Sequence, residues 1–465
     1  MYQTAQLVID GSNTTPGQVT IFENKHFRTG EREHCVQVNT INPVLIRTCT
    51  ALTSGDFCRA VGGAQVTLED NYIRGRIPAT KDYSAGLAFR GDYLKGFAAR
   101  RNIVRELGGL LLGQWRGKKK AEGGMPTDIS GNVFYNLHRK RSDGAGGTLA
   151  TTTIVSNHKE GSTRGRSDPN QTAGFTLPIG WEFAQALVVN CAGNKQDNLP
   201  AAFFGGLEFV GNMAIQEPGR GLAEDLFNFY LAGGESWDAP LAVRGWFVLG
   251  NYGNGINAQG QLWQPGQRWP TGGQRQPSGS YIAGAPQPTG DYSFGYQSMT
   301  GGLQQDGQDS ASYQGNGAFT IVQDAWLLGP GTLLGAQHSH DHRIERAKVV
   351  FTSRTRDGVT DFTGDPRVGV YMQNYDGSLV VQGQQLWAGN GIKDCVTVRP
   401  MDAAQYPQGF GTAHTDPALT TGNTLINRHA TQAEEKAAHL EFLTWCHARG
   451  IHLGPKFPAP AIIYG

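Results

Sequence analysis

Short segments of alternating apolar and polar residues recur along this chain at intervals of two to three dozen residues. The recurrent unit reads Φ-x-Φ-x-x-N-x-Φ, where Φ is apolar, and is clearest around Asn71 in "VTLEDNYI", Asn102 in "FAARRNIV" and Asn132 in "TDISGNVF". Such alternation places every second side chain on one face of a β-strand, so the pattern predicts strands through most of the chain. Further copies, some of them weaker, are centred on Asn24, Cys49, Asn212, Trp246, Asp324, Ala347 and Gln384.

The spacing between the copies predicts how these strands associate. The early copies lie 25, 22, 31 and 30 residues apart. A unit of this length cannot enclose a core of its own and must stack on its neighbours. The repeats show no helix in each unit, no regular leucine spacing and no hairpin dipeptides. We therefore expect an all-β solenoid, a parallel β-helix, in which the turn asparagine tolerates left-handed backbone and hydrogen-bonds to its copy on the next coil.

Two segments depart from the repeat. Residues 253–317 are rich in Gly, Gln, Pro and Ser, which predicts a long lateral insertion in a β-helix spanning 1–425. Near the C-terminus, Thr431 and Glu434 form a capping-box pattern and Gly450 ends an amphipathic run. One helix is expected from about residue 432 to about 449, within a segment 426–465 that packs on the solenoid as a cap. The alternative is a helix that binds a partner.

Composition and charge narrow the classes of function. The net charge is +1, so no overall field selects nucleic acid or a membrane surface, and no apolar run approaches the roughly 18 residues of a spanning helix. The N-terminus lacks the basic and apolar regions of a signal peptide. Both an internal protein and an exported one whose leader is absent remain open. The six cysteines contain no CxxC pair, which argues against a zinc site, although Cys35 and Cys58 are candidates for a disulfide between adjacent coils.

Several segments carry a resemblance to a known group of proteins. They are "EHCVQV", "TSGDFCRAVGG", "RKRSDGAGG", "IQEPGRGLAEDLFNFYLAGG" and the closing helix with "GIHLGP". Together with the repeats they resemble the right-handed parallel β-helix proteins of the pectate-lyase-like superfamily, and more closely bacterial secreted β-helix repeat proteins of unassigned activity. The resemblance implies a right-handed solenoid, a carbohydrate ligand, and a location outside the cell or at its surface.

The catalytic motifs of that superfamily are missing here. The W-[IV]-D-H strand of pectate lyases is absent, and the nearest match to R-x-P-x-x-R is "RIPATK", which has Lys81 where arginine is expected. The paired aspartates and G-H-G of polygalacturonases are absent as well. No catalytic residue is therefore carried over from the resemblance.

A basic cluster is the first candidate site in the residues themselves. Loops that leave the same corner of successive coils lie side by side, so distant residues can form one groove. Basic side chains there would attract a polyanion such as a uronate chain, and Arg141 could act as the base of a β-elimination. The alternative is a set of solvated loops. The residues expected to bind substrate are Lys118, Lys120, Arg139, Lys159 and Arg164, in loops that also contain Arg116, Lys119, His138, Lys140 and Arg166.

An acidic cluster is the second candidate. Glu217, Glu224 and Asp225 could serve as the acid and base of glycoside hydrolysis, with Glu235 and Asp238 on the following loop. Carboxylates are also the ligands that calcium prefers, so calcium is the one candidate cofactor. The alternative is turn chemistry, or pairing with nearby arginines. Asp56 in "SGD" is a further acid at a loop.

Histidines and tryptophans complete the candidates. His338, His340 and His342 alternate, so in a strand they would share one face and could ligate zinc or copper, although exposed residues at a turn are the simpler interpretation, and no metal ligand is assigned. Trp237 is expected to stack on sugar, and Trp246 occupies a repeat position and is expected to be structural. The other tryptophans in or near loops are Trp115, Trp181, Trp263 and Trp269.

We expect an extracellular β-helix that binds a polysaccharide in a lateral groove, as a polysaccharide lyase or glycoside hydrolase if it is catalytic. The alternative is a structural fibre, spike or surface protein that assembles with itself. Neither nucleic acid nor a membrane interior is expected as a partner.

Overall fold

The computed structural model describes the greater part of the coils and the C-terminal segment. The residues it describes are 3–29, 34–77, 86–140, 145, 152–154, 175–177, 181–182, 184–190, 202–215, 225–230, 232–249, 300–306, 318–328, 334–337, 341–350, 370–373, 380–381, 384–385, 389–398, 410–411, 415–428 and 430–458.

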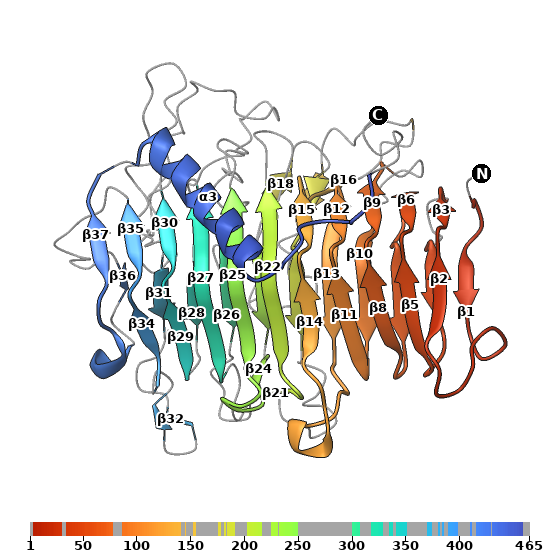
Figure 1. The fold of residues 1–465 in the computed structure, drawn as a ribbon, viewed down its shortest axis with the longest axis horizontal. Coiled ribbons are helices and arrows are strands. Elements are labelled where there is room, and N and C mark those ends of the chain that lie inside the picture. The colour runs from red at the N-terminus through yellow and green to blue at the C-terminus, as the bar shows by residue number, and fades with distance from the viewer. Residues whose placement is uncertain are drawn as a thin grey trace.

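The strands stack as parallel coils along one axis (Figure 1). One side of the coil is an 11-stranded parallel sheet. Each of its strands pairs with the equivalent strand of the next coil, not with its neighbour in sequence, which is the arrangement of a parallel β-helix. The strands are β1 (Leu7–Ile9), β4 (Val36–Val38), β7 (Cys58–Val61), β10 (Leu87–Asp92), β13 (Gly108–Gly113), β20 (Leu187–Asn190), β23 (Asp225–Tyr230), β26 (Thr300–Asp306), β28 (Leu334–Gln337), β31 (Val370–Gln373) and β36 (Phe410–Gly411).

The rest of each coil belongs to an 18-stranded sheet with a bend. Strands before the bend are β2 (Thr20–Glu23), β5 (Pro43–Arg47), β8 (Gln65–Glu69), β11 (Gly96–Arg100), β14 (Thr127–Ser130), β29 (His342–Glu345) and β34 (Gly391–Lys393). Strands after it are β3 (His26–Phe27), β6 (Thr50–Thr53), β9 (Tyr72–Gly75), β12 (Ile103–Arg105), β15 (Val133–Tyr135), β30 (Lys348–Val350), β35 (Val396–Val398) and β37 (Thr424–Ile426). Strands β22 (Leu207–Ile215), β25 (Leu241–Leu249) and β27 (Thr320–Leu328) run through the bend.

Small pairs of strands lie outside these two sheets. They are β16 (Arg139–Lys140) with β19 (Trp181–Glu182), β17 (Thr152–Ile154) with β18 (Phe175–Leu177), β21 (Ala202–Phe203) with β24 (Gly233–Gly234), and β32 (Val380–Val381) with β33 (Gln384–Gln385). Two short 3-10 helices, η1 (Lys120–Glu122) and η3 (Pro417–Leu419), complete the described elements apart from the C-terminal helix. The predicted class, an all-β right-handed parallel β-helix with a C-terminal α-helix, is confirmed.

An asparagine ladder runs inside the bend. Nδ2 of Asn71 donates to Oδ1 of Asn102 (2.8 Å), and Nδ2 of Asn102 donates to Oδ1 of Asn132 (2.9 Å). Asn132 bonds in the same way to Asn212 (2.9 Å), after which the buried Trp246 takes the position. The stacking role predicted for these asparagines is confirmed. At the first coil the ladder position is occupied by Lys25 and not by Asn24, because Thr50 pairs with His26.

The left-handed backbone lies one residue before the ladder, not on it as expected from the repeat. Ten residues there have φ between 52° at Thr48 and 65° at Gly131. Two adjacent positions therefore have different structural roles: the residue before the ladder turns the chain, and the asparagine forms hydrogen bonds between coils. The ten are Asn24, Thr48, Asp70, Arg101, Gly131, Gly211, Gly245, Asp324, Arg346 and Asp394.

Helix α3 (Gln432–Ala448) lies obliquely across β25, β27 and β30, and the tail after it runs back toward β9 (Figure 1). The predicted capping box is present, with the Thr431 hydroxyl accepting from the Glu434 amide and the Glu434 carboxylate accepting from the Thr431 amide. Ala438, Phe442 and Cys446 are buried against the sheet. Leu440 and Leu443 are 53% and 37% exposed, because only one narrow stripe of the helix meets the coils.

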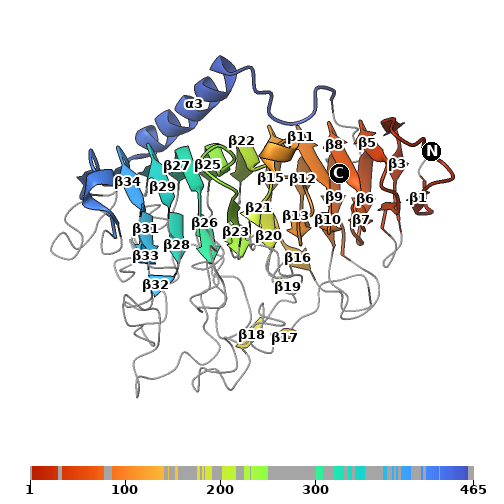
Figure 2. The same ribbon diagram turned by 90° about the horizontal axis from the view of Figure 1, so that it is seen from below.

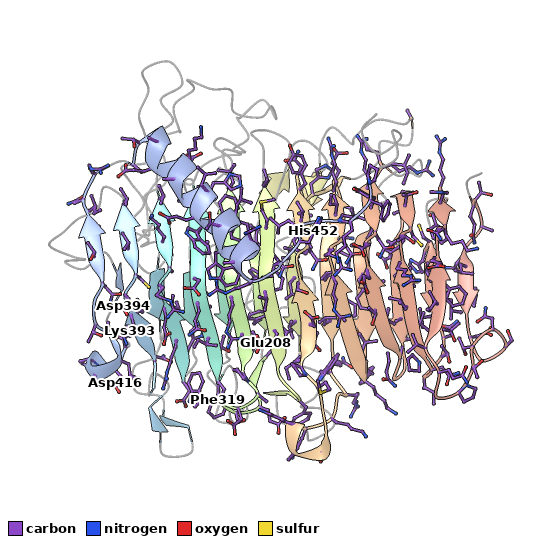
Figure 3. All side chains as sticks on the ribbon, in the orientation of Figure 1. Glu208, Phe319, Lys393, Asp394, Asp416 and His452 are labelled. Atoms are coloured by element: carbon purple, nitrogen blue, oxygen red, sulfur yellow. The ribbon has the colours of Figure 1, made fainter. Side chains whose placement is uncertain are left out.

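The glycines of the left-handed row explain where α3 and the tail cross the coils. A Cβ on Gly245 would lie 2.1 Å from the Trp445 ring, and one on Gly131 would lie 2.3 Å from the His452 carbonyl oxygen. Figure 3 labels His452 on the tail. Further along the row, Asp70 Oδ1 accepts a hydrogen bond from the amide of Lys456 in the tail (3.1 Å). The row therefore has glycine where α3 and the tail cross it closely, and a hydrogen-bonding side chain where the tail is held.

Three further expectations differ in detail from the structure. Val36 pairs with Cys58, so Cys35 does not lie over Cys58, and both thiols are free. The weak copy at Gln384 is not a coil but part of the antiparallel pair β32 and β33. Strand β26 falls within the expected insertion 253–317, yet it pairs with β23 and β28 in the main sheet. The final coil also carries a ladder asparagine that the repeat search missed, Asn423, which bonds to the Cys395 amide.

Candidate functional site

The outer face of the 11-stranded sheet presents polar and apolar side chains in register from coil to coil. Figure 2 shows this sheet on the side opposite α3. Inward neighbours such as Cys58, Ala60 and Phe89 are fully buried. The first outward row pairs residue by residue through Val8, Gln37, Arg59, Arg90, Leu111, Val188 and Asn228. A second row continues two residues further along the strands through Val61, Asp92, Gly113 and Asn190.

Five charged or titratable residues gather at the N-terminal part of this face, and we call them the charge cluster. Arg59 of β7 pairs in register with Arg90 of β10, while His34 and Asp56 each lie two residues before β4 and β7, and Asp92 ends β10. Asp56 Oδ2 lies 3.4 Å from both His34 Nδ1 and Arg90 Nε. Arg59 Nη1 lies 3.4 Å from His34 Nε2. Side chains from three successive coils thus contact one another.

The backbone fixes the acid of this cluster. The Asp56 side chain is only 6% exposed, and its Oδ1 accepts a hydrogen bond from the Leu87 amide (2.9 Å). That bond ties the carboxylate to the start of β10 on the next coil. The carboxylate is held by one backbone donor, with the cationic Arg90 and the His34 ring beside Oδ2.

Burial and charge act in opposite directions on His34. Burial lowers the pKa of the imidazole below its ordinary value, Asp56 raises it, and the charges of Arg59 and Arg90 lower it further. Within the part of the chain that the structure describes, neither His34 Nδ1 nor Arg90 Nε makes a hydrogen bond. His34 is therefore neutral at neutral pH, and because only an unprotonated Nε2 can accept from Arg59, Nδ1 carries the ring hydrogen and faces Asp56.

Asp92 is a second carboxylate with an altered proton affinity. Burial raises its pKa, and Arg90 and Arg59 partly offset that effect. A Cβ on Gly113 would lie 2.2 Å from Asp92 Oδ1, so the missing side chain at Gly113 leaves room for the carboxylate to lean toward the next coil. No ion pair joins Asp92 to either arginine among the described residues. The cluster therefore places one imidazole, two carboxylates and two guanidinium groups on one face.

The outer face of the 18-stranded sheet shows the contrasting arrangement. Its outward row alternates in sign through Glu23, Arg47, Glu69 and Arg100, in register. Arg47 Nε lies 2.6 Å from Glu23, and Arg100 Nε lies 2.5 Å from Asp128. Glu208, labelled in Figure 3, pairs in the same way with Arg244. The charges named on this face, all within the described residues, therefore pair with one another.

Only some of the sequence-based site residues lie within the described part of the chain. Glu217, Glu224, Arg141, Lys159 and Arg164 lie outside it. Asp225 is the first residue of β23, and Arg139 is half-buried in β16, opposite Glu182 of β19. Lys118 is exposed just before η1. None of these described residues forms a hydrogen bond or an ion pair with the charge cluster, so the expected site and the observed cluster are different places.

The basic and acidic clusters meet at one corner of the coil. Lys120 Nζ donates to the Asp238 carbonyl oxygen (2.5 Å), and the Lys120 amide donates to Glu235 Oε2 (3.1 Å). Trp237 lies between these acids in sequence, with the Arg343 guanidinium 4.3 Å over its ring. Of the residues expected to bind substrate, Lys120 therefore contacts the loop of the acidic cluster, and Trp237 contacts Arg343.

Burial corrects two of the remaining candidates. His342, the first residue of β29, is fully buried and points into the coil, so it cannot bind a metal at the outer surface. His338 and His340 lie outside the described residues. Trp115 is 3% exposed and stacks on Phe203, which makes it a core residue and not a sugar platform. Trp246 is fully buried, as expected of a structural residue. Across the described ranges no group of three or more potential metal ligands occurs, and no helix has the length and hydropathy of a membrane span.

Sequence reasoning missed most of the charge cluster. Asp56 was noted as an isolated acid, but Arg59 and Arg90 were not aligned. The signal was present in "FCRAVG" and "AFRGDY", which both place arginine between a buried residue and a small one. Aligning those two strands would have placed the arginines side by side.

Comparison with known proteins gives matches in structure only. No protein-family model and no curated protein matches the chain. The chain is similar in structure to alginate lyase AlyF-OU02 in complex with G6, with 11% identity, a TM-score of 0.31, and coverage of 93% of this chain and 87% of that one. It is also similar to a PL6 alginate lyase in complex with a trisaccharide, with 11% identity, a TM-score of 0.33, and coverage of 92% and 87%. These similarities transfer no activity or residue role to this chain.

Proposed function

We propose that this protein binds a polysaccharide along the outer face of the 11-stranded sheet. The observation that carries the proposal is the in-register outward row whose polar members are Gln37, Arg59, Arg90 and Asn228, with the apolar Leu111 and Val188 between Arg90 and Asn228. Successive coils repeat at about 4.8 Å, so this row offers one set of contacts per step along the axis. A linear polymer of repeating sugars fits such a periodic surface, whereas a compact ligand would use only one step of it.

The other faces support this choice. Helix α3 and the tail cover the outer side of β25, β27 and β30, where Phe247 and Trp326 are buried. The sheet before the bend carries paired charges. Amide and guanidinium groups, in contrast, suit hydroxyl and oxyanion groups of sugars. This function implies a location outside the cell or at its surface, where such polymers occur.

The test uses the whole chain and two matched variants. Val188 lies in the middle of the proposed row, and Ile21 lies on the outer face of β2. Retention of the protein on neutral and acidic glycan gels should fall at least tenfold for Val188→Glu and stay unchanged for Ile21→Glu. Failure of every glycan to retain the wild type, or equal retention by both variants, contradicts the proposal.

The same glycans test whether binding leads to cleavage. An unsaturated product absorbing in the ultraviolet indicates a lyase, and new reducing ends without it indicate a glycoside hydrolase. Electron microscopy of the purified protein tests the structural alternative. Filaments together with no glycan retention would favour an assembly protein.

A further inference from the structure

We propose that the charge cluster binds one oxyanion of an acidic saccharide between Arg59 and Arg90, and that His34 takes up a proton as the anion binds. The proposal rests on the proposed function, because it names the class of sugar and the place where its charge is held. It also adds a consequence, which is that acidic glycans bind more tightly as the pH falls.

Two arginines in register are the first observation. On neighbouring parallel strands the outward positions are about 4.8 Å apart, and like charges placed opposite one another destabilise a sheet. Elsewhere the chain avoids or compensates such a pairing. Glu23, Arg47 and Glu69 alternate in sign. Arg74 lies opposite Arg105, but Glu106 is within 3.4 Å of both guanidinium groups, whereas Asp56 pairs with Arg90 and not with Arg59. An anion between the two guanidinium groups would remove the repulsion.

The partners of these arginines leave them available. Arg90 Nε lies 3.4 Å from Asp56 Oδ2 and makes no hydrogen bond among the described residues. Arg59 Nη1 lies 3.4 Å from His34 Nε2. Arg90 is 34% exposed, so its guanidinium reaches the surface of the sheet. Guanidinium groups bind carboxylate or sulfate oxygens in a two-pronged geometry. A uronate carboxylate and a sugar sulfate ester share the required chemistry.

Charge balance explains why His34 takes up a proton when the anion binds. With His34 neutral, the formal charges of Arg59, Arg90, Asp56 and Asp92 sum to zero. An incoming anion leaves one negative charge in a half-buried site, and protonation of His34 restores neutrality. The proton comes from solvent, so binding consumes one hydrogen ion and forms or breaks no covalent bond.

The environment of His34 fits this role. Its side chain is 20% exposed, with Nδ1 facing Asp56 and Nε2 facing Arg59. The arginine charges lower the pKa of the imidazole, and an anion that screens them would let it rise. The charged groups that act on His34 among the described residues are Asp56, Arg59 and Arg90. Burial raises the pKa of Asp92 in the same cluster, so Asp92 is tested separately.

The experiment is isothermal calorimetry of the full chain with a uronate hexasaccharide, a sulfated oligosaccharide and a neutral one of equal length. Titrations run between about pH 8 and about pH 5, in buffers of different ionisation enthalpy, so that proton uptake is measured directly. We expect acidic-sugar affinity to rise up to tenfold per pH unit, with uptake approaching one proton. Which of the two acidic sugars shows the effect identifies the oxyanion.

Variants separate the parts of the proposal. Arg59→Gln and Arg90→Gln should each abolish the preference for acidic sugar. His34→Gln should retain binding at about pH 8 and lose the proton uptake, whereas Asp92→Asn should keep it. Arg100→Gln, on the paired face, should bind as the wild type does. Circular dichroism checks that each variant is folded.

Equal affinity for neutral and acidic sugars, or proton uptake that survives in His34→Gln, overturns the proposal. If neutral polysaccharide binds and the acidic preference is absent, the proposed function stands and this inference fails. If no polysaccharide binds but inorganic sulfate binds with uptake of a proton, the anion site stands and the proposed function fails.

Discussion

The asparagine ladder gives the most direct test of what holds the coils together. Asn102 is 3% exposed and makes four side-chain hydrogen bonds. Its Nδ2 donates to Asn132 Oδ1 and to the Leu68 carbonyl, and its Oδ1 accepts from the amide and Nδ2 of Asn71. The substitution Asn102→Ala removes all four and leaves their partners buried.

The expected loss follows from these bonds. At about 1 kcal/mol for each hydrogen bond, with a further cost for buried groups left without partners, Asn102→Ala should reduce the free energy of unfolding by about 4 kcal/mol. Asn39 is the matched control, because it is exposed and its side-chain oxygen accepts a solvent-exposed hydrogen bond from Gln37. Asn39→Ala should cost less than about 0.5 kcal/mol.

Urea unfolding followed by far-ultraviolet circular dichroism measures the loss, and hydrogen exchange locates it. In a solenoid, stability is the sum of coil terms and interfaces between neighbours, so the effect should be local. Exchange should accelerate in peptides covering β8, β9, β11, β12, β14 and β15, and not in those covering β30 and β35. A loss below about 1 kcal/mol, or one equal to that of Asn39→Ala, would refute the ladder as a source of stability.

Three further outcomes are expected. Gly245→Val should push Trp445 away and raise hydrogen exchange throughout α3, whereas Gly62→Ala, at a similar φ with nothing within 4 Å, should leave α3 protected; equal exchange in both contradicts the packing argument. His342 is neutral in the fold because burial lowers its pKa to about 3, while the unfolded residue takes up a proton below its ordinary value of 6.5. The free energy of unfolding should therefore fall by up to about 1.4 kcal/mol per pH unit as the pH drops from 6.5 toward 3. In His342→Leu the urea midpoint should depend less on pH over that range. Burial raises the pKa of the described thiols, so a disulfide reagent should leave them unreacted until urea is added, and rapid reaction of the native protein at any of Cys35, Cys49, Cys58, Cys395 and Cys446 would contradict this.

Features that depend on neighbouring residues could be predicted from the sequence. Alternation of apolar and polar residues produces strands wherever it occurs, and the repeat length requires stacking. Asn71, Asn102 and Asn132 therefore revealed both the solenoid and the ladder. The capping box at Thr431 and Glu434 is equally local, so the helix could be placed to within a residue or two.

Contacts between coils depended on register, which the sequence leaves open. The connections between strands vary in length, and a shift of one residue turns every side chain to the opposite face. This is why Lys25 and not Asn24 holds the first ladder position, and why Val36 and not Cys35 pairs with Cys58.

The charge cluster shows the same limit at the level of function. His34, Asp56 and Arg90 are distant in sequence, and no motif joins them. The parallel pairing of β4, β7 and β10 alone places their side chains together. Composition and repeats thus determined that the chain is a solenoid with one closing helix. Only the tertiary structure decided that these side chains meet on one face, because backbone hydrogen bonds between coils, and not the order of residues, select the neighbours of each side chain.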